Sequence, residues 1–315
     1  MALGYRAPLY LMAFDHRGSF AHDLFGVQPA GDPNDIVRAG IRDAKDLIYE
    51  GFVQAIDRGA PRDAAGVLVD EEFGTQVART ASAAGYVLAM PVEKSGQAEF
   101  EFFYGEDFGA HIERFGPTFA KVLVRYNPDG DRELNARQTR RLAQLSTWLH
   151  DRERKFLFEL LVPATGEQLA GCGGEQGRYD RELRPELVVR TLADLQDGGV
   201  EPDIWKIEGL ETADDCAQVV AQARSSGRDE VCCVVLGRGA DRARVEEWLR
   251  TAAGVPGFDG FAVGRTIWED ALRAWLAGTV TRDQAATAIA DRYLELIDTF
   301  VAASGATTLA GAERS

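Results

Sequence analysis

Short apolar runs alternate with longer amphipathic segments along almost the whole chain. The runs are rich in Val, Ile, Leu and Phe, and continuous apolar runs of this length are typical of strands buried on both faces of a parallel sheet. Eight of them can be placed: Leu9–Phe14, Gly66–Val69, Val87–Met90, Ala120–Arg125, Lys155–Leu161, Ile204–Ile207, Val231–Leu236 and Gly260–Val263.

The segments between these runs carry apolar residues at helical spacing, which predicts helices that cross over between parallel strands. Eight such units close into a single (β/α)8 barrel of the α/β class, and 315 residues suit one barrel with modest insertions. We place the barrel at residues 1–303 and a small, polar, flexible tail at 304–315. The clearest predicted helices are Ile36–Ile56, Gln138–Asp151, Pro185–Gln196, Asp214–Ser225, Arg242–Thr251, Ile267–Trp275 and Arg282–Ala302.

Three connections are longer than usual, and long loops in compact domains often carry function. The first follows Phe20, the second spans Pro91–Pro117, and the third is the Gly-rich segment Pro163–Leu183. For the aromatic segment Phe100–Phe108, three interpretations stay open: a lid, a dimer contact or packed surface.

The composition narrows the class of partner. A content of 45% hydrophobic and 27% charged residues suits a globular protein with a large core. The net charge of -15 disfavours nucleic acid and anionic membranes as partners. We see no signal-peptide pattern and no apolar stretch of membrane-spanning length, and we expect a cytoplasmic protein. Reduced thiols are therefore expected at Cys172, Cys216, Cys232 and Cys233.

Charged residues gather where the predicted strands end, which is where barrels of this kind place their active sites. A charge inside an apolar strand costs several kcal/mol unless it is paired or shifted in pKa. Glu159 and Lys206 are the clearest cases. The other polar residues at strand ends are Asp15, His16, Arg17, Asp70, Glu71, Glu72, Glu93, Lys94 and Glu208.

Lysine is rare in this chain, with five lysines among 35 basic residues. Arginine keeps its proton, whereas a lysine at a site of low dielectric constant can become a neutral nucleophile. We therefore favour Lys206 as a nucleophile over a structural ion pair with a carboxylate. Lys121 lies near the start of its predicted strand, so its orientation stays open, and Lys94 follows another strand.

A lysine nucleophile needs an acid/base partner, because imine formation and carbon–carbon cleavage both move protons. Glu159 suits this role, and its apolar neighbours are expected to raise its pKa. Lys121 or Lys94 would supply a cation that depresses the pKa of Lys206. Asp15 is expected to orient a hydroxyl group, the alternative being a solvated turn residue.

Two glycine-containing loops are candidates for binding phosphate after the seventh and eighth strands. The first contains Gly237 and Arg238, and the second contains Gly264 and Arg265 before a predicted helix. Glycine lets the backbone approach an anion, and Arg265 can bind it through two N–H groups. The alternative for Arg265 is a helix-capping turn.

Four segments together carry a family resemblance: Ala13-Phe14-Asp15-His16-Arg17-Gly18, Leu68-Val69-Asp70-Glu71-Glu72-Phe73-Gly74, Trp205-Lys206-Ile207-Glu208 and Gly264-Arg265-Thr266-Ile267-Trp268. They resemble the class I tagatose-bisphosphate/sulfofructose-phosphate aldolase group. The chain is more similar still to the DUF2090 domain fused to some 5-dehydro-2-deoxygluconokinases of inositol catabolism.

The resemblance implies a role for each matching residue. Lys206 would form the Schiff base, Glu159 would be the acid/base, and Asp15 and Lys121 would complete the catalytic set. Arg265 would bind phosphate. The group usually has glutamine where this chain has His16, and serine near the glycine of the seventh loop, where this chain has Leu236-Gly237-Arg238.

These observations favour a class I aldolase that needs no cofactor and no metal. The resemblance implies 6-phospho-5-dehydro-2-deoxygluconate as substrate, cleaved to dihydroxyacetone phosphate and malonate semialdehyde. We expect further substrate or phosphate contacts from residues at the strand ends and in the two glycine-containing loops: His16, Arg17, Lys94, Gly237, Arg238 and Gly264. Alternatives are another ketose phosphate or sulfo-sugar phosphate, a non-catalytic phosphosugar sensor, and a metal-dependent class II aldolase. The histidines His16, His22, His111 and His150 are too scattered to suggest a zinc site. Self-association into a homo-oligomer stays open.

Overall fold

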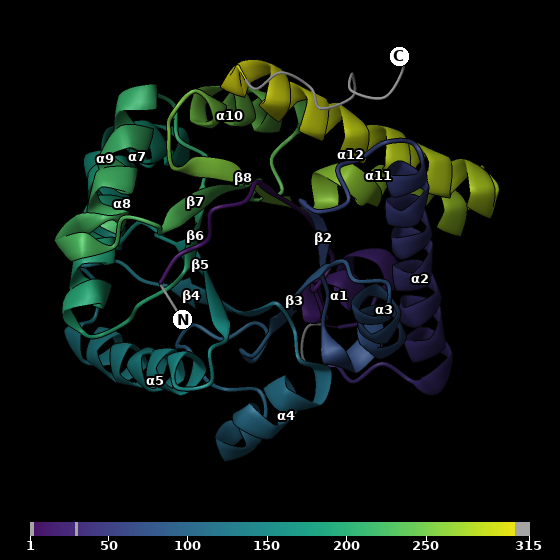
Figure 1. The fold of residues 1–315 in the computed structure, drawn as a ribbon, viewed down its shortest axis with the longest axis horizontal. Helices are drawn as coiled ribbons and strands as arrows, with labels where there is room; N and C mark the ends of the chain where they lie inside the picture. The colour runs from purple at the N-terminus through teal and green to yellow at the C-terminus, as the bar shows by residue number, and fades with distance from the viewer. Residues whose placement is uncertain (1–2, 29–30, 306–315) are drawn as a thin grey trace, which may run out of the picture.

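The predicted barrel is confirmed in the computed structural model, which describes residues 3–28 and 31–305. Eight parallel strands pair in chain order and β1 pairs with β8, so the sheet closes (Figure 1). The strands are β1 (Leu9–Ala13), β2 (Ala65–Leu68), β3 (Val87–Pro91), β4 (Phe119–Arg125), β5 (Lys155–Leu161), β6 (Ile204–Glu208), β7 (Cys232–Leu236) and β8 (Phe258–Val263).

Helices surround the sheet (Figure 1). The last one includes Ser304, and the rest of the predicted tail, from residue 306, lies outside the described residues. The helices are α1 (Gly18–Phe25), α2 (Asp35–Asp57), α3 (Glu71–Ala83), α4 (Phe108–Phe115), α5 (Arg132–His150), α6 (Gly166–Gly171), α7 (Gln176–Glu182), α8 (Arg184–Asp197), α9 (Ala213–Ala223), α10 (Arg242–Ala253), α11 (Arg265–Leu276) and α12 (Arg282–Ser304), with short 3-10 turns at Gly105–Asp107 and Ser225–Gly227.

Both faces of the strands are apolar because the barrel has two cores. One core fills the barrel interior with side chains such as Leu11, Phe119 and Leu157, and the other lies between the sheet and the helices. Since side chains alternate between the two faces of a strand, both residue sets must be apolar, which explains the continuous apolar runs. The interior residues nearest the carboxyl ends of the strands are polar instead.

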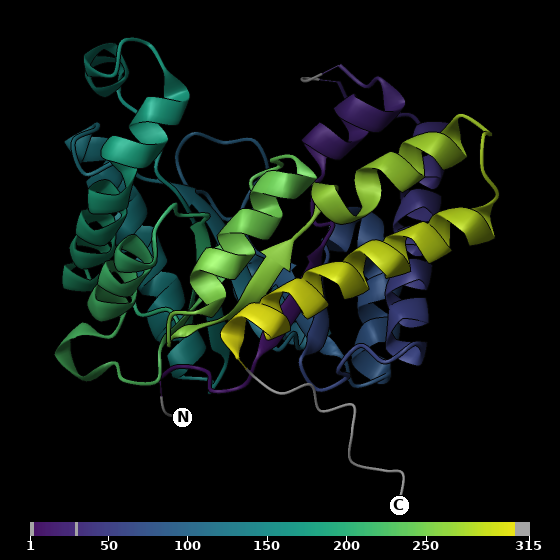
Figure 2. The ribbon, with the colours of Figure 1, turned by 90° about the horizontal axis from the view of Figure 1, so that it is seen from above.

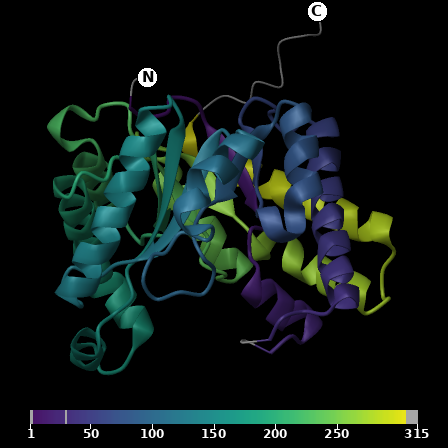
Figure 3. The same cartoon turned by 90° about the horizontal axis from the view of Figure 1, so that it is seen from below.

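Helices α2 and α12 pack side by side and cover the closure of the sheet (Figure 3). The Tyr293 hydroxyl of α12 donates to the Tyr10 carbonyl of β1 at 2.5 Å. Helix α1 and the α6–α7 segment project from one end of the barrel (Figure 2). Of the helices in the described chain, none is long and apolar enough to cross a membrane.

The amino end of the barrel is closed by the segment before β1. Asp203, buried at the start of β6, accepts hydrogen bonds from Gly4 N, Phe156 N and Lys155 Nζ, each at 2.8 Å. The Tyr5 ring packs edge-on against Phe119 of the interior core, with centroids 5.1 Å apart. These contacts satisfy a buried carboxylate and cover the interior.

The aromatic segment Phe100–Phe108 is packed against the protein. Phe102 stacks on Phe108 at 4.2 Å between ring centroids, and Phe108 meets Trp148 of α5 edge-on. This packing supports the interpretation as packed surface, and the lid and dimer-contact interpretations stay predictions. The packed segment anchors a short hairpin in which Glu93 pairs with Phe102.

Candidate active site

A cavity of about 620 Å³ opens at the carboxyl end of the barrel. Its walls combine strand residues with the loops that follow the strands. Every predicted site residue lines this one cavity: Asp15, His16, Arg17, Lys94, Lys121, Glu159, Lys206, Gly237, Arg238, Gly264 and Arg265.

Two buried lysines and three buried carboxylates form the floor of this cavity. Lys121 Nζ of β4 lies 2.9 Å from an oxygen of each of Asp15, Glu93 and Glu159. Lys206 Nζ of β6 lies 2.9 Å from the other oxygen of Glu159. Glu159 therefore bridges the two ammonium groups, and Lys121 points into the cavity, which the sequence left open.

The three carboxylates keep Lys121 charged. Burial alone would lower the pKa of Lys121, but the attraction of Asp15, Glu159 and Glu93 outweighs it and raises the pKa well above its usual value. Burial would likewise raise the pKa of Asp15, yet Lys121, His16 and Lys206 hold it below its usual value. Lys121 is thus a fixed cation and not a candidate nucleophile at neutral pH.

The expected rise in the pKa of Glu159 is wrong. Burial does act in that direction, but Lys121 and Lys206 outweigh it and lower the pKa of Glu159 below its usual value. The sequence neighbours Phe158 and Leu160 are apolar, whereas the groups that reach its carboxylate come from the adjacent strands β4 and β6. Glu159 is therefore an ionised base in the resting site.

Lys206 has fewer carboxylate partners than Lys121. Within the described chain its ion-pair partner is Glu159, which it shares with Lys121. On its other side, its register partner on β7 is the buried Val234. Lys206 thus has one carboxylate partner where Lys121 has three, and it shares that partner with a second ammonium.

The loops after β7 and β8 together present groups that suit an anion. Arg238 and Gly239 both have positive φ, 51° and 70°, in a turn closed by Ala240 N donating to Gly237 O at 2.9 Å. Helix α11 starts at Arg265, directly after Gly264, with no side chain capping its first N–H groups. Such uncapped N–H groups are donors that favour a negative charge.

Arg265 lies over this turn. A Cβ atom built on Gly239 would be 2.1 Å from Arg265 Nη2, so a larger residue at this position would displace the guanidinium. Throughout the described residues, the Arg265 side chain has no carboxylate partner and no hydrogen bond. An arginine without a countercharge at a helix N-terminus is suited to phosphate.

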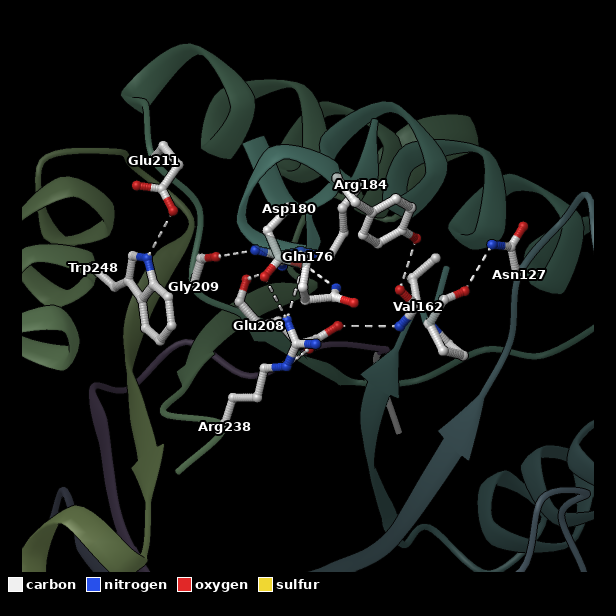
Figure 4. A network of polar contacts seen from close by, with 12 residues as sticks. Asn127, Val162, Gln176, Asp180, Arg184, Glu208, Gly209, Glu211, Arg238 and Trp248 are labelled. Carbon is white, nitrogen blue, oxygen red and sulfur yellow. Dashed lines mark hydrogen bonds and ion pairs between the residues drawn. The ribbon is translucent and has the colours of Figure 1, made fainter. Parts of the chain in front are cut away.

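Arg238, by contrast, is held by two carboxylates (Figure 4). Its Nε lies 2.8 Å from Glu208 Oε1 of β6, and its Nη1 lies 3.1 Å from Asp180 Oδ2 of α7. The other Glu208 oxygen accepts from Val162 N at 3.1 Å. Arg238 therefore links the α6–α7 segment to the barrel, and its charge is already balanced.

His16 and Arg17 occupy the cavity wall after β1. Burial lowers the pKa of His16 to about 4, so the imidazole is neutral at pH 7, and its Nδ1 has no partner among the described residues. Arg17 Nη2 donates to the Glu93 carbonyl at 2.6 Å. Lys94 lies farther out, with its side chain 48% exposed and 3.4 Å from Glu101.

The sequence reasoning placed Glu93 and Glu208 at strand ends but gave them no role, and it did not name Asp180, which pairs with Arg238. Glu93 lies two residues beyond Pro91 of β3, and Glu208 two residues beyond Lys206, so alternation along the strand was an available signal for both. Asp180 lies in α7, within the long connection after β5, and nothing in the neighbouring sequence indicates that its side chain reaches Arg238. In the described residues no three His, Cys, Asp or Glu side chains are grouped to hold a metal ion.

Comparison with known proteins gives one family and a set of similar folds. The family described as "Uncharacterized protein conserved in bacteria (DUF2090)" matches residues 5–304. No curated protein matches the chain. The Corynebacterium glutamicum protein Cgl0159 is similar in structure, with 17% identity, a TM-score of 0.57, and coverage of 95% of this chain and 88% of that one.

A fructose-bisphosphate aldolase from Plasmodium falciparum is also similar, with 12% identity and a TM-score of 0.63. The match covers 97% of this chain and 98% of the aldolase. At such identities these two matches concern the fold, and the chemistry has to be argued from the cavity.

Proposed function

The chain belongs to the DUF2090 family, and from that premise we propose that it is a class I aldolase in which Lys206 forms a Schiff base with a ketose phosphate. The observation that carries the proposal is the unequal environment of the two buried lysines. Three carboxylates keep Lys121 charged, whereas Lys206 shares one of them beside an apolar wall. The aldolase among the similar folds supports the same reaction class.

The proposed reaction starts when Glu159 accepts a proton from Lys206, 2.9 Å away. The neutral amine attacks the ketone carbon, and loss of water from the carbinolamine gives a protonated imine. A base removes the proton of the hydroxyl beside the scissile bond, and the imine nitrogen accepts the electron pair of that carbon–carbon bond. The aldehyde leaves, and protonation and hydrolysis of the enamine release the second product.

The surrounding residues take supporting roles. Asp15, fixed by Lys121 at 2.9 Å, orients a substrate hydroxyl. Glu159 serves the successive proton transfers. Arg265, the α11 N-terminus and the Gly237–Gly239 turn bind the phosphate of the ketone half, with His16 and Arg17 beside it.

The finer substrate proposal is 6-phospho-5-dehydro-2-deoxygluconate, with dihydroxyacetone phosphate and malonate semialdehyde as products. It rests on the resemblance to kinase-fused relatives. Other ketose phosphates and sulfo-sugar phosphates form the comparison set for a turnover assay. Chelation with EDTA is expected to leave the activity unchanged, and loss of activity would favour the class II alternative.

The experiment that tests the proposal is reductive trapping. Borohydride with dihydroxyacetone phosphate should add the mass of the reduced adduct to a peptide containing Lys206, because the imine needs only the ketone half. Lys206→Arg should abolish the label, since a guanidinium keeps its proton. A label on Lys121 or Lys94 with Lys206 unmodified would contradict the assignment. An adduct without turnover of any candidate substrate would favour a phosphosugar sensor.

A further inference from the structure

A third buried lysine lies behind the cavity, outside the catalytic set. Lys45 of α2 has a fully buried side chain. Its Nζ donates to the Phe14 carbonyl at 2.8 Å and to the His16 carbonyl at 3.0 Å, and it forms an ion pair with Asp70. An ammonium has three N–H groups, so these contacts use all of them.

The two carbonyls that Lys45 binds belong to the residues on either side of Asp15. Phe14 N still donates to Leu68 O of β2 at 2.8 Å, but β1 ends at Ala13 and the segment beyond has left the strand. Lys45 therefore fixes the backbone around Asp15 from the helix layer. Lys121 fixes the Asp15 carboxylate from the barrel interior, 2.9 Å away.

Stability alone explains this arrangement poorly. A buried ion pair seldom stabilises a fold more than well-packed apolar residues of the same volume, because both charges lose their hydration. Asp70 does cap α3 by accepting from Phe73 N at 2.8 Å, but an uncharged asparagine also caps helices. The Lys45 ammonium differs from an apolar side chain in that it holds the Phe14 and His16 carbonyls toward one nitrogen atom.

We propose that Lys45 is a positioning residue, which holds Asp15 and His16 in the geometry that the cavity requires. It touches neither substrate nor the reacting atoms, and it acts through the backbone of Phe14 and His16. The kinetic test rests on the proposed aldolase activity, whereas the structural test does not.

Two variants separate positioning from stability. Lys45→Met leaves the Asp70 carboxylate buried without its partner, so the melting temperature should fall by about 5–10 °C. Adding Asp70→Asn removes that unpaired charge while keeping the cap, so most of the loss should be recovered. Turnover should stay about 10–100-fold below wild type in both variants, with KM within about threefold, because Asp15 is misplaced. Recovery of turnover together with the melting temperature would overturn the proposal.

Lys155→Met is the matched control, since Lys155 also binds a buried carboxylate and a carbonyl but lies at the amino end. It should lower the melting temperature and leave turnover unchanged. If the wild type cleaves no ketose phosphate, a crystal structure of the double variant still decides. The Asp15–Lys121 contact should lengthen beyond hydrogen-bond distance within an intact barrel, and an unchanged contact would refute the proposal.

Discussion

The two ends of the barrel use the same kinds of residues and differ in how completely they are paired. At the amino end, Asp203 accepts two backbone N–H groups and the Lys155 ammonium, and beside it one buried atom, His150 Nε2, lacks a hydrogen-bond partner in the part of the chain that the structure describes. At the carboxyl end, buried polar atoms of the described residues lack partners, namely His16 Nδ1, Arg17 Nε and Glu93 Oε2, and Arg265 has no countercharge.

This difference separates a polar network that stabilises the fold from one prepared for a ligand. A buried polar atom without a partner costs about 1–3 kcal/mol, so a fold tolerates it where another molecule can supply the missing bond. The satisfied network should therefore govern stability, and the unsatisfied one should govern activity. Four changes test this separation.

The largest expected effect is on stability, from Asp203→Ala. The change leaves the Lys155 ammonium and two backbone N–H groups without their acceptor, so the free energy of unfolding should fall by about 3–5 kcal/mol. Chemical denaturation gives this quantity. Turnover of the folded fraction should match wild type, and a parallel loss of turnover would break the distinction between the two ends.

Glu159→Gln should lower the activity of the protein rather than its stability. The amide keeps the shape but cannot carry the proton from Lys206, so kcat should fall at least ~100-fold, or about 2.7 kcal/mol. Steady-state kinetics should show a much smaller change in KM. Equal losses in kcat and in substrate affinity would assign Glu159 to binding instead.

Arg265→Ala should weaken binding of the anion. Loss of a charge-assisted contact is expected to raise KM about 10–50-fold, with some loss of kcat because the phosphate also positions the ketone carbon. Inorganic phosphate should inhibit the wild type and much less the variant. Arg238→Ala is the control for the guanidinium alone, because it keeps the backbone of the turn and removes a side chain already paired with Glu208 and Asp180; phosphate inhibition should change much less. Equal inhibition of wild type and Arg265→Ala would exclude Arg265 as the ligand.

The smallest effect concerns the pH dependence contributed by His16. Burial lowers the pKa of His16 to about 4 from 6.5, so between these values the unfolded chain binds a proton that the folded chain does not. Stability should therefore fall as the pH falls from about 6.5 to 4. His16→Gln should reduce this fall by about 1 kcal/mol, since partial exposure weakens the shift. Identical slopes for the two proteins would contradict the buried, neutral imidazole.

The barrel was predictable because its strands are buried on both faces and read as uninterrupted apolar runs. The site was partly predictable for the same reason, since charges such as Glu159 and Lys206 stand out in those runs. Lys121 shows a limit. Its strand begins at Phe119, which faces the barrel interior, so alternation along the strand places Lys121 in the interior as well. The predicted strand begins one residue later, at Ala120, and so leaves out Phe119, the residue that indicates the inward face.

Contacts between strands lie beyond such reasoning. The pKa of Glu159 depends on Lys121 and Lys206, and their approach follows from strand register, which one strand's sequence does not specify. The same holds for Arg238, whose partner Asp180 comes from a helix within a long connection. The sequence therefore indicated which charged residues belong to the site, but not which of them form ion pairs with one another.

The pairing of β1 with β8 also bears on how the protein is made. Leu9 aligns with Gly260, so the first strand lacks one neighbour until about 250 further residues have been synthesised. At ~5–20 residues per second, a nascent chain spends on the order of ten seconds to a minute with that edge open. An exposed apolar edge is a template for wrong pairing. Protection of β1 during translation, by a chaperone or by early packing of α2, is thus a requirement that follows from circular closure.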